Sequence, residues 1–168
     1  MSLVNGLPAH VLLVHFVIVL VPLTALALVL CAIWPKAAQR LGVVLPLLAL
    51  VTLASVPLAT NAGEWLERHV ESDALVRRHA ELGDGLLPWV GGLFVLAFVV
   101  WWALGRSASR APDGTRRPAT LLRITAAVLS LVVAAGAVVD VYRIGDSGAK
   151  AAWHDGYSKT ASHGGDQD

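Results

Sequence analysis

Charged residues are absent from four long stretches of the chain, and these stretches set its pattern of hydrophobic and polar positions. No Asp, Glu, Lys or Arg occurs in residues 1–35, 41–63, 85–105 and 124–139. Apolar residues surround each stretch instead of forming one stripe, which is typical of membrane-spanning helices. A span needs about 20 such residues. We therefore expect an all-α bundle of four transmembrane helices, at about 10–34, 41–62, 85–105 and 120–142.

The fourth uncharged stretch is short, so its helix must include charged residues at its ends. Arg123 lies at one end and Asp140 at the other. A long arginine side chain can extend its charged head to the interface, which makes a full span feasible. We expect one membrane domain over residues 1–153 and a polar, disordered tail over residues 154–168.

The distribution of Lys and Arg predicts the orientation of the bundle. The connections at 35–40 and 106–123 carry seven basic residues in 24 positions, whereas 64–84 and 143–168 carry six in 47. Short cytoplasmic connections are enriched in Lys and Arg. We therefore expect both termini on the extracytoplasmic side of a cell membrane. The net charge of +1 conceals this polarity, because eleven of the twelve acidic residues fall on the outer side.

Composition narrows the classes of function. The chain is 56% hydrophobic and 15% charged, against about 25% charged in soluble domains. Nucleic-acid binding is not expected, since there is no excess of basic residues. The lipid bilayer is the expected environment, and other membrane or respiratory-chain proteins are candidate partners. No nucleophile constellation, phosphate-binding loop or metalloprotease motif occurs, so the sequence does not favour an enzyme.

The polar residues of greatest chemical interest are the histidines, because imidazole is the commonest metal ligand and also binds haem iron. In the predicted orientation all six lie on the outer side: His10, His15, His69, His79, His154 and His163. His15 lies inside an apolar stretch, and an ionisable residue there is a functional-site hypothesis. The alternative for each is a solvated or simply hydrogen-bonded side chain.

Helix geometry limits how the histidines can combine. His10 and His15 differ by about 140° around a helix and about 7.5 Å along it, so an undistorted helix cannot place both on one small ion. His79 falls on a predicted helix that begins near Ser72 or Asp73, both good N-caps, and continues toward the third span. Asp140 and Asp146 add carboxylates at the same rim.

Four sequence segments resemble a family of bacterial four-helix membrane proteins known as domain of unknown function 2231. They read GLPAHVLLVHF at 6–16, TNAGEWLE at 60–67, HAELG at 79–83 and RIGDSGAKAAW at 143–153. The resemblance implies a haem-cytochrome-like or metal-binding bundle in which His10, His15 and His79 recur. Many members have proline at the position of Val17 and histidine at the position of Asp146.

The main functional hypothesis is an outer-rim site for haem b or a transition metal, used in electron transfer or metal handling. Its candidate cofactor ligands are His10, His15 and His79, and Asp140 and Asp146 are further candidate metal ligands. By residue counting, His15 lies deeper than His79, whereas His10 and His79 both lie near the rim.

Two alternatives remain open. An accessory or scaffold subunit of a larger membrane complex would use the small-residue row Ala126, Ser130 and Ala134 either for packing within the bundle or for a partner. A small-ion transporter would depend on a buried His15 and on Asp140, but we detect no internal repeat of the kind common in transporters.

Overall fold

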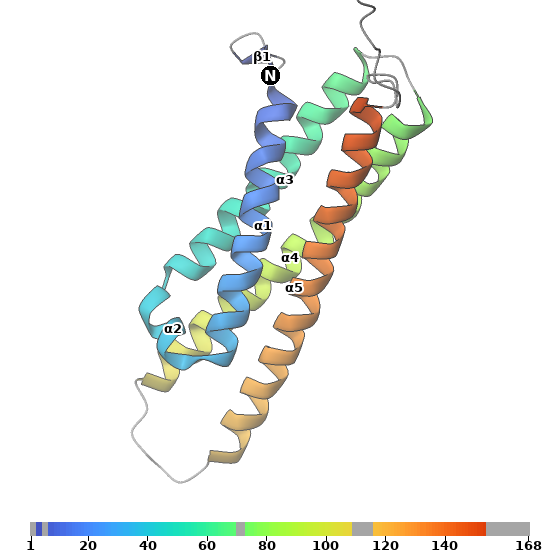
Figure 1. Ribbon diagram of the computed structural model, residues 1–168. Helices are drawn as coiled ribbons and strands as arrows, with labels where there is room; N and C mark the ends of the chain where they lie inside the picture. The colour runs from blue at the N-terminus through green and yellow to red at the C-terminus, as the bar shows by residue number, and fades with distance from the viewer. Residues whose placement is uncertain (1–2, 5–6, 70–72, 109–115, 154–168) are drawn as a thin grey trace, which may run out of the picture.

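The computed structural model describes residues 3–4, 7–69, 73–108 and 116–153. Four long helices dominate it: α1 (Ala9–Ile33), α3 (Val44–Glu67), α4 (Ala74–Ala108) and α5 (Arg116–Trp153) (Figure 1). The short helix α2 (Pro35–Leu41) follows α1, and a two-residue antiparallel pair, β1 (Leu3–Val4) with β2 (Leu7–Pro8), precedes it. The predicted all-α fold is confirmed, and all four long helices are long and apolar enough to cross a membrane.

Two of the helices extend well beyond their predicted spans. Helix α4 begins at Ala74 instead of residue 85, and α5 ends at Trp153 instead of residue 142. The start of α4 is close to the predicted N-cap, since Asp73 accepts a hydrogen bond from the Leu75 amide at 2.8 Å. The ends of the uncharged stretches mark where a helix leaves the hydrocarbon of the bilayer, but the helix itself can continue into water.

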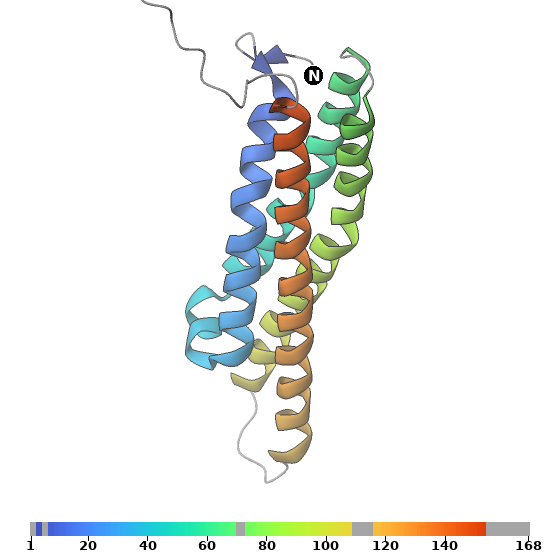
Figure 2. The same ribbon diagram turned by 45° about the vertical axis from the view of Figure 1, so that its right-hand side comes forward.

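The four helices form a ring in the order α1, α3, α4, α5. Helix α1 packs against α3 and α5, and α4 packs against the same two. The start of α1, the end of α3, the start of α4 and the end of α5 lie together at one end of the bundle, which we call the histidine end (Figures 1 and 2). Helix α2 lies at the opposite end.

The core is built from small and branched side chains. Val21, Leu28 and Val90 are fully buried, and the hydroxyls of Thr24 and Thr52 lie 2.7 Å apart between α1 and α3. Ser130 and Ala134 are buried, and Ala126 packs against the core. The small-residue row of α5 therefore serves packing within the bundle, where small side chains allow close approach.

The burial pattern of α4 repeats that of α1. Counted from His79, the buried residues of α4 are 7, 11, 14, 18 and 21 positions on: Leu86, Val90, Leu93, Ala97 and Val100. Counted from His10, buried residues occupy the same steps in α1: Val17, Val21, Thr24, Leu28 and Cys31. Both helices thus turn the same face inward relative to their histidine.

Helices α3 and α5 match in the same way. The buried residues of α5 are Ser130, Ala134, Ala137, Val141 and Ser147, and each corresponds to a buried residue of α3 that lies 85 positions earlier. The hairpins α1/α3 and α4/α5 are therefore structural repeats, related by an approximate two-fold axis along the bundle. The sequence shows no detectable repeat because the two halves share a burial pattern and not an obvious sequence.

Candidate functional site

His10 connects α1 to α3 at the histidine end. Its side chain is half-buried, and its Nδ1 donates a hydrogen bond to the carbonyl of Ala59 at 2.9 Å. The ring lies directly against Gly63, where a Cβ atom would be 3.0 Å from Cε1 of the imidazole. Glycine at position 63 therefore permits this close approach.

His79 connects α4 to α5 in the same manner. Its Nδ1 lies 3.1 Å from the carbonyl oxygen of Ile144 and 3.0 Å from Oγ of Ser147. Ser147 donates its own proton to the Ile144 carbonyl at 2.8 Å, so its oxygen can accept from the imidazole. A Cβ atom at Gly148 would lie 2.9 Å from Cε1 of His79.

The two histidine environments correspond under the two-fold axis. In each, the histidine of one helix donates a hydrogen bond to a backbone carbonyl of the adjacent helix. Its ring also packs on the glycine that lies four residues after that carbonyl residue. Because a carbonyl can only accept, Nδ1 carries the proton in both neutral rings. No hydrogen bond from another described residue reaches Nε2 of either ring. Metal-ligating histidines are commonly fixed by such a bond from the other ring nitrogen.

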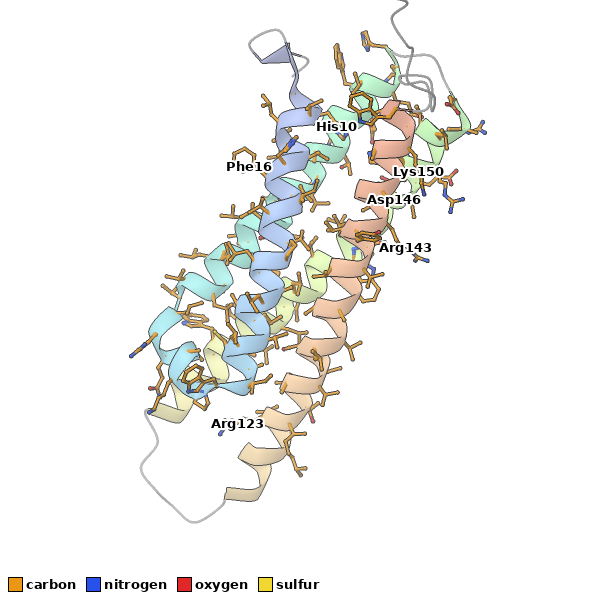
Figure 3. All side chains as sticks on the ribbon, viewed as in Figure 1. His10, Phe16, Arg123, Arg143, Asp146 and Lys150 are labelled. Atoms are coloured by element: carbon orange, nitrogen blue, oxygen red, sulfur yellow. The ribbon has the colours of Figure 1, made fainter. Side chains whose placement is uncertain are left out.

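The two rings meet across the bundle. The ring centroids of His10 and His79 lie 6.1 Å apart, with the ring planes at 81°. The histidine end therefore holds one imidazole from each repeat, and the two rings form an edge-to-face pair. Of the two, His10 is labelled in Figure 3. We call His10 and His79 the histidine pair.

His15 does not join this pair. Its side chain is exposed on the bundle surface, and its Nδ1 lies 2.5 Å from the carbonyl oxygen of Val11 in its own helix. The adjacent Phe16 also points away from the other helices (Figure 3). The transporter hypothesis required a buried His15, and that expectation is wrong: the 140° offset from the inward-facing His10 turns His15 outward.

The remaining histidines and the candidate carboxylates lie elsewhere. His69 stacks on Trp65 with ring centroids 4.0 Å apart, and His154 and His163 lie outside the described residues. Asp146 forms an ion pair of 2.6 Å with Lys150 on the outward side of α5 (Figure 3). Asp140 faces Gly85 of α4, and its Oδ2 is buried with no hydrogen-bond partner among the described residues.

The described part of the chain contains no group of three or more His, Cys, Asp or Glu side chains that could hold a metal ion. The structure thus brings His10 and His79 together but adds neither His15 nor the two aspartates to them. Three further residues contact the histidine pair and are not predicted from the sequence: Gly63, Ser147 and Gly148. All three lie within the TNAGEWLE and RIGDSGAKAAW segments, and the resemblance of these segments to the family is the signal that could have identified them.

Four helices able to cross a membrane, with paired histidines at one end, define a multi-pass membrane protein. The chain belongs to the family described as predicted membrane protein (DUF2231), which matches residues 6–161. The resemblance found in the sequence is therefore confirmed. No curated protein and no solved structure gave a match to the chain.

Proposed function

We propose that the histidine pair holds one haem b or one transition-metal ion, for electron transfer or metal handling. The observation that carries this proposal is the matched hydrogen bonding of His10 and His79, which satisfies Nδ1 and leaves Nε2 of both rings without a hydrogen bond from another described residue.

The number of donors favours haem within this proposal. Protein zinc sites use three or four side-chain ligands, whereas a haem iron can be held by two side chains. The histidine pair supplies two imidazoles, with ring centroids 6.1 Å apart.

The residues of the chain would position the cofactor, and the cofactor would supply one-electron chemistry. His10 and His79 would hold the cofactor, while Ala59, Ile144 and Ser147 would hold their rings through Nδ1. Electron transfer also requires a redox partner, and we propose another membrane or respiratory-chain protein.

The scaffold alternative has less support. Its motivating feature was the small-residue row Ala126, Ser130 and Ala134, and that row is used for packing inside the bundle. Large apolar side chains are exposed on all four long helices, as expected for helices surrounded by lipid.

We further propose that the histidine end faces outward from the cell, so that both termini are extracytoplasmic. The denser basic residues at 35–40 and 106–123 support this orientation. A cysteine placed near the N-terminus, in a Cys31→Ala background, should react with an impermeant maleimide in intact cells. Reaction only after the cells are opened would contradict the orientation.

Cofactor content tests the proposed function. Protein purified in mild detergent is expected to contain about one haem or transition-metal ion per chain, measured by absorption spectroscopy and elemental analysis. His10→Ala should lose most of it because one of the two side chains proposed to hold the cofactor is removed. His15→Ala, a matched change on the exposed side of the same helix, should retain it. A wild-type protein with neither haem nor metal, after expression with both supplied, would overturn the proposal.

A further inference from the structure

A second polar feature is a groove between α4 and α5, on the surface of the bundle near the histidine end. The groove has a volume of about 510 Å³. Leu75, Arg78 and Leu82 line it from α4, and Tyr142, Arg143 and Lys150 are among the residues that line it from α5. It combines three cationic side chains with apolar ones, and neither member of the histidine pair lines it.

The groove carries two cationic groups that have no ion-pair partner among the described residues. Asp146, the acidic residue of the lining, is paired with Lys150 at 2.6 Å. Arg78 and Arg143 are exposed, and neither forms an ion pair with another described residue. Asp140 precedes Arg143 by three residues and interacts with it electrostatically, but the two side chains form no ion pair. Two guanidinium groups are therefore available to an external anion.

The position of the groove along the helices matches the headgroup level of a bilayer. The candidate span of α5, Leu121–Trp153, contains 33 residues, about 50 Å of helix against about 30 Å of hydrocarbon. Its uncharged part ends at residue 139, so Arg143 lies just past the apolar region. Arg78 precedes the uncharged part of α4 by seven residues, about 10 Å further along.

The two-fold repeat provides an internal comparison for this groove. In the α1/α3 half, the positions that correspond to Arg78, Arg143 and Lys150 are occupied by Ala9, Leu58 and Trp65. None of these residues is charged. The shared scaffold therefore does not require basic residues at these positions, and the cationic groove is a property of the α4/α5 half alone.

We propose that the α4/α5 groove binds the phosphate group of an anionic phospholipid. Arginine forms paired hydrogen bonds with phosphate oxygens, which suits Arg78 and Arg143. Basic pockets between transmembrane helices hold anionic lipid headgroups on the cytoplasmic side of membranes, and we propose the same chemistry at the histidine end. The acyl chains would continue along the exposed apolar surface of α5 below Tyr142, where Val138 and Val139 are exposed. Neither His10 nor His79 lines the groove, although Ser147, which contacts His79, does.

Native mass spectrometry of delipidated protein in detergent tests this proposal, with short-chain phosphatidylglycerol as the probe. Wild type should bind one molecule in preference to phosphatidylcholine of the same chain length. The double variant Arg78→Gln/Arg143→Gln should lose about tenfold or more in affinity, since two charge-assisted contacts are removed. Arg77→Gln removes a neighbouring exposed charge outside the groove and should leave the affinity within about twofold of wild type.

Three results would overturn the proposal. One is equal binding of phosphatidylcholine, and another is a loss in Arg77→Gln as large as that in the double variant, which would indicate non-specific attraction. The third is displacement of the lipid by inorganic phosphate at a similar concentration, which would indicate a site for a free anion. His10→Ala should bind phosphatidylglycerol as wild type does, so that failure of the cofactor proposal leaves this one standing.

Discussion

Gly148→Val is expected to lose the cofactor although both histidines remain in place. A Cβ at position 148 would lie 2.9 Å from Cε1 of His79, so the ring must move away from α5. That movement would break the hydrogen bonds from Nδ1 to Ile144 and Ser147. Loss of such orienting bonds typically costs 10- to 100-fold in metal affinity. Titration of the purified variant with haem or metal ion would measure the loss.

Gly145→Val is the matched control for this prediction. Gly145 lies on the same helix three residues earlier, and a Cβ there would meet no atom within 4 Å. Its affinity should stay within about twofold of wild type, as for a substitution away from any site. Equal losses in Gly145→Val and Gly148→Val would mean that a valine in this part of α5 acts through the helix and not through His79.

Gly136→Val is expected to destabilise the bundle at its middle. A Cβ at this position of α5 would overlap the indole ring of Trp89 on α4. Overpacking of this kind costs about 1–3 kcal/mol, which thermal denaturation in detergent would detect as a lower melting temperature. Gly91→Val provides the control, because a Cβ at Gly91 would have no atom within 4 Å. A melting temperature for Gly136→Val that equals the control would contradict the packing of Trp89 on Gly136.

The spans could be predicted from the sequence because a bilayer imposes one clear requirement, a stretch of about 20 residues without charge. The helix ends could not be predicted as well. Residues 143–153 are polar enough to leave the hydrocarbon, but nothing in them stops a helix, and α5 continues through them to Trp153. Hydropathy marks the membrane boundary, and helix termination depends on local caps.

The candidate site was predictable in part. His10 and His79 were expected near one rim by residue counting, and the structure brings their rings together. The rotation of each helix about its own axis was not predictable, because apolar residues surround α1 on all sides and only packing selects the inward face. The sequence therefore makes His15 a candidate for the interior of the bundle, whereas its side chain lies on the exposed surface.

The repeat escaped sequence reasoning for a related physical reason. Many different apolar side chains can face lipid or fill a small core. The two hairpins can therefore differ in residue type at almost every position and still bury the corresponding positions. What they share is a histidine, a carbonyl and a glycine at fixed spacing. That pattern becomes visible only when the helices are placed side by side.

The central claim is that His10 and His79 form one site between the two repeats. The most direct test is one haem titration, followed by absorbance, of wild type, His10→Ala, His79→Ala and the double variant. Each single change should weaken binding about tenfold or more, and the double variant should be little worse than the weaker single one, since both ligands serve one ion. Wild-type affinity in either single variant, including wild-type affinity at half the stoichiometry as two independent sites would give, would contradict a shared site.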